Sequence, residues 1–125
     1  MHASPRKEAA TSFMKLVAAN KVAEAYEKYV APGFRHHNAY YPGDAASLQK
    51  GMQESAERFP NKRFDIQRAV EEGDVVMVHS RMLLQPGMPE AALVHIFRFE
   101  NDRIAELWDI CQMEPDDIVN TLGMF

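Results

Sequence analysis

Apolar residues recur at helical spacing in the first quarter of the chain. The Ser4-Pro5 pair begins a first predicted helix, about 5–18, because serine caps helices and proline at the first helical position loses no hydrogen bond. The same spacing continues over a second predicted helix, about 20–30, which Ala31-Pro32-Gly33 ends. The apolar positions that carry this pattern are Phe13, Leu16, Val17, Val22, Ala25, Tyr26 and Tyr29.

An aromatic and polar segment without helical periodicity comes next. Residues 34–43 contain two adjacent histidines and two adjacent tyrosines and end in a Pro-Gly turn, so we expect them to cross the rim of the fold. Asp44 then caps a third predicted helix over about 45–58, and Pro60-Asn61 stops that helix.

After residue 60 the hydrophobic period changes to two. This alternation predicts four strands, at about 64–70, 75–84, 91–99 and 104–112. The links between them are as short as those of hairpins, which implies antiparallel pairing of consecutive strands. Helices followed by a meander of strands predict one α+β domain over residues 1–125, with its helices on one face of the sheet. For the tail, 115–125, a short helix and an extended clasp both remain open.

A four-stranded sheet that curves around three helices forms a cone, and the open end of a cone is a natural ligand pocket. The third strand has a more aromatic face, which includes His95 and Phe97, and we expect this face to be concave. On the last strand Leu107 and Asp109 share one face and Trp108 lies on the other. Alternation alone does not orient the second and last strands, because both faces of each carry apolar residues.

The composition of the 125-residue chain narrows the class of protein. With 46% hydrophobic residues and a net charge of -4, the chain fits neither a disordered protein nor a nonspecific nucleic-acid binder. It has no apolar run of about 18 residues to span a membrane, and its first residues lack the apolar stretch of a secretory signal. Cys111 is the single cysteine, which excludes a disulfide within the chain. We therefore expect a small cytoplasmic domain.

The histidines are the most informative polar residues. His2 lies in the terminus and is set aside, and of the adjacent His36 and His37 we expect at most one to point inward. The chain has no glycine-rich nucleotide loop, zinc-protease motif or nucleophile elbow. A metal site without a recognisable motif is an alternative interpretation, with ligands of suitable type at His37, His79, His95 and Asp109.

Several short segments are similar to one known family. Phe34-Arg35-His36-His37-Asn38 resembles the Tyr-x-Gln-His-Asn segment that follows the second helix in SnoaL-like proteins. The further matching segments are Pro60-Asn61-Lys62, Val78-His79-Ser80, Ile96-Phe97-Arg98, Arg103-Ile104-x-Glu106-x-Trp108-Asp109 and Gly123-Met124-Phe125. The chain thus resembles the SnoaL-like polyketide cyclase family of the NTF2-like superfamily. The resemblance implies a cone-shaped α+β barrel, with three N-terminal helices packed on a curved antiparallel sheet, a deep pocket and commonly a homodimer through the sheet.

The resemblance also implies a class of chemistry. The segment His95-Ile96-Phe97-Arg98-Phe99 is similar to the steroid-isomerase strand that carries an inward acid, and the same alignment places Asp109 on the pocket side. We expect cofactor-independent acid–base chemistry on a small carbonyl compound, with neither cofactor nor metal. The alternatives are a noncatalytic domain that binds an apolar ligand and a structural dimer with a vestigial pocket. The candidate catalytic residues are Asp109, His95 and His79, and the candidate substrate-binding residues are His37, Asn38, Phe97, Trp108 and Leu107.

Overall fold

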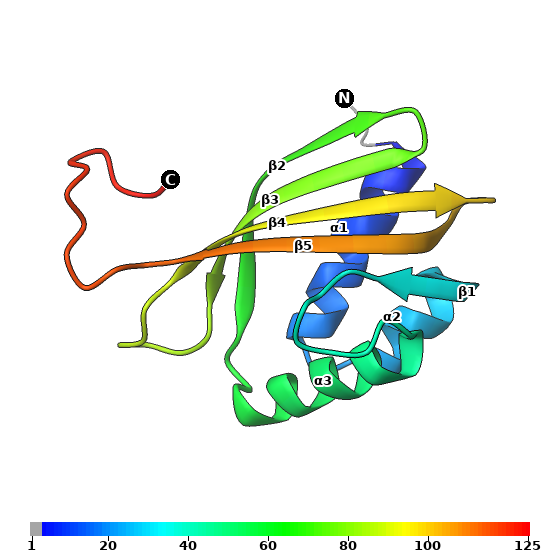
Figure 1. Ribbon diagram of the computed structural model, residues 1–125, viewed down its shortest axis with the longest axis horizontal. Helices are drawn as coiled ribbons and strands as arrows, with labels where there is room; N and C mark the ends of the chain where they lie inside the picture. The colour runs from blue at the N-terminus through cyan, green and yellow to red at the C-terminus, as the bar shows by residue number, and fades with distance from the viewer. Residues whose placement is uncertain (1–3) are drawn as a thin grey trace.

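A computed structural model describes residues 4–125, so His2 lies outside the described residues. The described residues form three helices and five strands (Figure 1). The first strand lies between the second and third helices, and the other four strands follow the third helix. The helices are α1 (Pro5–Ala18), α2 (Val22–Tyr29) and α3 (Ala45–Arg58). The strands are β1 (Val30–His36), β2 (Arg63–Glu72), β3 (Val75–Leu83), β4 (Ala91–Glu100) and β5 (Arg103–Met113).

Polar caps fix where two of the helices begin. The Ser4 hydroxyl accepts a hydrogen bond from the backbone N–H of Lys7 at 3.1 Å, and Pro5 occupies the first turn. The Asp44 carboxylate accepts one from the backbone N–H of Ser47 at 2.9 Å. These contacts satisfy N–H groups that the first helical turn leaves without a partner. The three helices predicted from the sequence are confirmed.

The sheet has one strand more than the sequence predicts. Its order is β1-β5-β4-β3-β2; β2 to β5 pair antiparallel as expected, whereas β1 pairs parallel with β5. The Pro32-Gly33 pair ends α2 as predicted but does not end the regular structure. Gly33 takes a positive φ of 77°, and the β1–β5 register shifts between Val30 and Arg35. The glycine thus lets the chain bend within an edge strand, where a proline is tolerated.

The core lies between the helices and the concave side of the sheet (Figure 1). Phe13 of α1 packs edge-on against Phe97 of β4, with 5.9 Å between the ring centroids. It also contacts the Tyr26 ring of α2, which is tilted relative to it, at 5.6 Å. Phe97 is fully buried. This packing leaves the sheet open at one end, and the predicted α+β cone is confirmed.

The tail beyond β5 forms neither helix nor strand. It runs past the end of the sheet and turns back toward it (Figure 1). Phe125 stacks on His79 of β3 with 6.0 Å between the rings, and the Arg81 guanidinium lies 5.1 Å from the Phe125 ring. Of the two alternatives for the tail, the extended clasp describes it. Within residues 4–125, none of the helices is long and apolar enough to cross a membrane.

Candidate functional site

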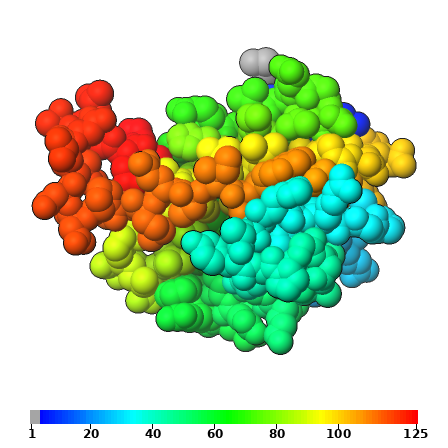
Figure 2. Space-filling model, viewed as in Figure 1, coloured from blue at the N-terminus to red at the C-terminus, as the bar shows by residue number. Residues whose placement is uncertain are grey.

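A cavity of about 390 Å³ opens between the concave side of the sheet, α1, α3 and the rim segment, residues 37–41. This volume is typical of sites for small molecules. In Figure 2 the surface is hollowed beside the rim segment, between it and the loop that joins β3 to β4. Most of the lining is apolar and comes from Phe13, Met14, Val17, Leu48, Met52, Phe64, Met82 and Leu93.

Asp109 and His95 lie on the wall of this cavity as direct neighbours. They are in-register partners on β5 and β4, and both line the cavity. Directly opposed residues of antiparallel strands have Cβ atoms about 4.5–5.5 Å apart. The inward orientation that the sequence predicts for both residues is therefore confirmed.

Asn38 holds the Asp109 carboxylate from the rim. Its side-chain N–H donates to Asp109 Oδ2 at 2.9 Å, while its carbonyl oxygen accepts the backbone N–H of Tyr40 at 2.9 Å. The second contact fixes which end of the amide faces the carboxylate, because a backbone N–H can only donate. Asp109 Oδ1 carries no hydrogen bond from the described residues. One oxygen is thus anchored and the other is free to act.

His95 lies in an aromatic setting. Its ring stacks on Phe97, with 5.9 Å between the rings, and meets Phe64 edge-on at 5.8 Å. Burial lowers the pKa of His95 to about 4, and the nearby Asp109 charge only partly opposes this effect. The imidazole is therefore neutral at pH 7. Its Nδ1 is buried and makes no hydrogen bond within residues 4–125.

Lys62 is a cavity residue that the analysis of the sequence did not select. It lies between α3 and β2, and its ammonium donates a hydrogen bond to the Ser55 hydroxyl of α3, which also lines the cavity. Burial lowers the pKa of Lys62, and its charge contributes to lowering the pKa of His95. The only signal in the sequence was its place in the Pro60-Asn61-Lys62 segment that resembles the family. The periodicity of a strand entry does not reveal which helix covers it.

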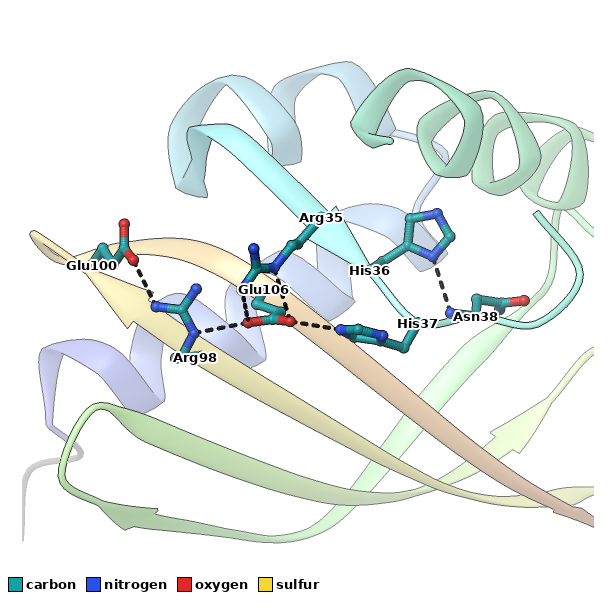
Figure 3. A network of polar contacts seen from close by, with 7 residues as sticks. All are labelled: Arg35, His36, His37, Asn38, Arg98, Glu100 and Glu106. Atoms are coloured by element: carbon teal, nitrogen blue, oxygen red, sulfur yellow. Dashed lines mark hydrogen bonds and ion pairs between the residues drawn. The ribbon is translucent and has the colours of Figure 1, made fainter. Parts of the chain in front are cut away.

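A charged network behind the cavity wall positions the rim (Figure 3). The Glu106 carboxylate accepts hydrogen bonds from Arg98 at 3.0 Å and Arg35 at 3.3 Å, and His37 Nε2 lies 2.6 Å from its other oxygen. Only 7% of the Glu106 side chain is exposed, which the three donors make tolerable for a carboxylate. The contacts with Arg35 and His37 lower the pKa of Glu106 to about 2.

The two adjacent histidines have different positions. His37 lines the cavity rim and stacks on Trp108, with 4.9 Å between nearly parallel rings. His36 is buried, accepts the backbone N–H of Asn38 at Nδ1 (3.0 Å) and donates from Nε2 to the Pro42 carbonyl at 2.6 Å. The Nδ1 contact requires the neutral form with hydrogen on Nε2. His36 therefore shapes the rim turn, and His37 is the one that reaches the cavity.

The expectation that His79 faces the pocket is wrong. On β3 the buried residues are Val76, Val78 and Ser80, so His79 lies on the opposite, outer face. There Arg68 Nη1 lies 2.9 Å from its Nδ1, and Phe125 covers its ring. Apolar residues on both faces of this strand concealed its orientation in the sequence.

Three of the candidate substrate-binding residues do not line the cavity. Phe97 and Leu107 point inward as expected, but both lie deeper, in the closed core. Trp108 lies on the outer face and supports His37. The placement of His37 and Asn38 on the cavity rim agrees with the prediction. The alternative metal site fails on geometry because His79 is on the other face of the sheet; residues 4–125 bring no three potential ligands together.

The family assignment follows from a match over most of the chain. The family model of the SnoaL-like domain matches residues 10–107. The chain belongs to the SnoaL-like domain family. A comparison with curated proteins finds no significant match.

Solved structures share the SnoaL-like fold of this chain. A "putative polyketide cyclase" from Acidithiobacillus ferrooxidans is 24% identical, with a TM-score of 0.72 over 90% of this chain and 91% of that one. IdmH from Streptomyces antibioticus, also named a "putative polyketide cyclase", is 18% identical (TM-score 0.71, 86% and 91% covered). AclR from Streptomyces galilaeus, named a "putative hydroxylase", is 18% identical (TM-score 0.74, 88% and 80% covered). These likenesses establish the fold, and the different names show that the fold alone does not specify the reaction.

Proposed function

We propose that this SnoaL-like protein catalyses acid–base chemistry on an enolisable carbonyl compound without a cofactor, as a cyclase or isomerase. The observation that carries the proposal is the in-register pair of Asp109 and His95 on the cavity wall, with one Asp109 oxygen anchored by Asn38. A positioned base and a neighbouring hydrogen-bond donor are the two groups that enolisation requires. The cyclase names of two similar structures are consistent with this substrate class.

The proposed reaction begins at the free oxygen of Asp109. The carboxylate removes a proton from the carbon next to the carbonyl, the C–H electrons form a C=C bond, and the carbonyl π electrons move to oxygen. The neutral His95 ring donates its N–H to that oxygen. In an isomerisation the proton on Asp109 then returns to another carbon. In a ring closure the enolate carbon attacks a second carbonyl, whose π electrons move to its oxygen, and that oxygen takes the proton from Asp109. A positioned base typically contributes about 10²–10⁴ in rate.

A noncatalytic ligand-binding domain is the second candidate, and the apolar lining of the cavity favours it. In that case the cavity holds an apolar molecule, and Asp109 with His95 only orients it. The two functions differ in one measurable property, the exchange of protons at the ligand's α-carbon.

The test uses methyl naphthyl ketone, an apolar enolisable probe, in deuterated buffer at neutral pH. NMR follows the loss of its methyl protons with the wild-type protein and with Asp109→Asn. Asp116→Asn, in the exposed tail, is the matched control. Acceleration by the wild type and the control, but not by Asp109→Asn, supports the enzyme. Binding of the ketone without accelerated exchange in any of them favours the noncatalytic domain.

We further propose that two copies associate through the outer face of the sheet. Exposed apolar side chains lie there on three strands, with Val70 of β2 56% exposed, Met77 of β3 46% and Ile110 of β5 58%. Burying such side chains against a second copy removes apolar surface from water and therefore stabilises a dimer relative to two monomers. A cytoplasmic location stays a prediction from the sequence.

A further inference from the structure

The Lys62 ammonium has no negatively charged partner in the part of the chain that the structure describes. Lys62 makes no ion pair with any residue of 4–125, although it is only partly exposed and its chain lies against the cavity. Its one hydrogen bond goes to the neutral hydroxyl of Ser55. Removing a cation from water is costly unless an anion compensates for the lost hydration. This placement of Lys62 therefore lowers the stability of the fold unless an anionic ligand compensates for the charge.

Ser55 adds a second donor at the same point. An ammonium can only donate, so the Ser55 oxygen is the acceptor in the contact with Lys62. The hydroxyl hydrogen of Ser55 is then free to point elsewhere, and Lys62 keeps two further N–H groups. Both side chains line the cavity. Together they offer donors, and no negative charge, to a group inside it.

The charges of the cavity are separated along its wall. In the part of the chain that the structure describes, the cavity lining contains one lysine, Lys62, and one carboxylic acid, Asp109. These two groups act on His95 in opposite directions, because Asp109 raises its pKa and Lys62 lowers it. No acidic group contributes to the pKa shift of Lys62. An anionic group is therefore repelled at the Asp109 side and attracted at the Lys62 side. This arrangement gives an asymmetric ligand one preferred direction.

We propose that Lys62 and Ser55 form an anion subsite that binds the carboxylate of an oxo acid and directs its enolisable carbonyl toward Asp109 and His95. The enolisable carbonyl group of this ligand rests on the proposed function, whereas the anion subsite is independent of it. The ligand class is thus an apolar molecule of a size that suits about 390 Å³, with a carboxylate at the end away from the reacting carbon.

The test compares two fluorescent probes that differ in one charged group. Anilinonaphthalene sulfonate carries a permanent anion on an apolar body, and phenylnaphthylamine has the same body without the anion. Fluorescence titration gives the Kd of each probe for the full chain and its variants. Charge-assisted hydrogen bonds are strong enough that we expect Lys62→Met to weaken sulfonate binding about 10- to 100-fold. The neutral probe should bind the variant as it binds the wild type.

Matched variants separate a local contact from net charge. Lys50→Met removes the same charge from an exposed position on α3 and should leave both probes unaffected. Lys62→Arg keeps the cation and should restore most of the sulfonate affinity, and Ser55→Ala should give a smaller loss. Equal sulfonate affinity in Lys62→Met and wild type, with both folded by circular dichroism, overturns the proposal. An equal loss in Lys50→Met overturns it as well.

Asp109→Asn distinguishes this proposal from the proposed function. It removes the proposed base but leaves the Lys62–Ser55 pair intact, so it should bind the sulfonate at least as tightly as the wild type. Loss of proton exchange without loss of sulfonate binding supports both proposals. Selective sulfonate binding by a protein that never accelerates exchange supports the anion subsite and rejects the enzyme.

Discussion

His95 and Asp109 face each other across β4 and β5 in direct register, yet no hydrogen bond joins their side chains. Asp109 is held instead by Asn38 from the rim, and His95 is held by the aromatic rings around it. Each group is thus positioned by a different part of the fold, and neither satisfies the other. Such a pair is suited to act on a third molecule in the cavity.

Replacing Asp109 by Asn should remove the base while leaving the shape of the wall. We expect the rate of α-proton exchange in the ketone probe to fall about 10²- to 10⁴-fold, because an amide cannot accept the proton. NMR exchange rates at saturating ketone give the comparison. Asp116→Asn should exchange at the wild-type rate, and an unchanged rate in Asp109→Asn would assign the base to another residue.

Asn38→Asp should shift the pH dependence of the same reaction. The new carboxylate keeps an oxygen for the Tyr40 N–H but replaces the donor beside Asp109 by a like charge. A like charge within hydrogen-bonding distance raises the pKa of a carboxyl group, so the acidic limb of the pH–rate profile should move to higher pH. Asn61→Asp, at an exposed position, is the control. A lower rate with an unshifted profile would limit Asn38 to substrate contact.

The strands show how far alternation carries a prediction. On β4 the aromatic residues alternate with smaller apolar ones, so the concave face was identified and His95 was placed correctly. On β3 apolar residues occupy both faces, and the family resemblance did not resolve the choice for His79. The orientation of such a strand depends on which face the helices cover, and that is information from tertiary packing.

Two further features needed the three-dimensional structure. The edge strand β1 was missed because Pro32-Gly33 is typical of a turn or loop. Its partner β5 also lies about 70 residues away along the chain. Lys62 was missed because a polar residue before a strand is ordinarily exposed. Its place in the cavity depends on Ser55 of α3 lying across it. Local pattern describes neither contact.

Glu106→Gln should destabilise the protein at neutral pH and much less at pH 2. The folded carboxylate has its pKa lowered to about 2 by Arg35 and His37, so its contribution to stability is complete above the unfolded pKa near 4.5 and is lost as pH falls toward 2. We expect the free energy of unfolding at pH 7 to fall by about 1–3 kcal/mol, the size of charge-assisted hydrogen bonds. Urea denaturation should show this difference shrinking between about pH 4.5 and pH 2.

The control for Glu106 is a second acid on the same arginine. Glu100 also accepts a hydrogen bond from Arg98, at 2.7 Å, but its side chain is 62% exposed. Solvent screens such a pair, so Glu100→Gln should change stability by less than about 1 kcal/mol. Equal losses in the two variants would mean that burial does not distinguish these carboxylates.

Met77→Asp tests the proposed association through the outer face. A charge at the centre of an apolar interface is costly to bury, so the variant should sediment as a monomer at concentrations where the wild type sediments as a dimer. Val119→Asp is the matched control, because Val119 is 92% exposed in the tail and away from the sheet. A wild type that is monomeric throughout, or a dimer unaffected by Met77→Asp, would rule out this interface.

His95→Leu should separate stability from activity. Burial lowers the folded pKa of His95 to about 4 from 6.5, so the unfolded chain binds a proton there between these pH values and the folded chain does not. Wild-type stability therefore falls as pH decreases from about 6.5 to 4, by about 2 kcal/mol between pH 7 and pH 5. His95→Leu lacks this loss and also removes a buried Nδ1 without a partner, so it should be at least as stable as the wild type at pH 5 while losing proton exchange.

Urea denaturation at the two pH values provides the comparison, with His79→Leu on the outer face as the control that keeps the wild-type loss. If His95→Leu loses as much stability as the wild type between pH 7 and pH 5, His95 is not held neutral by burial, and the neutral donor assigned to it in the reaction is wrong.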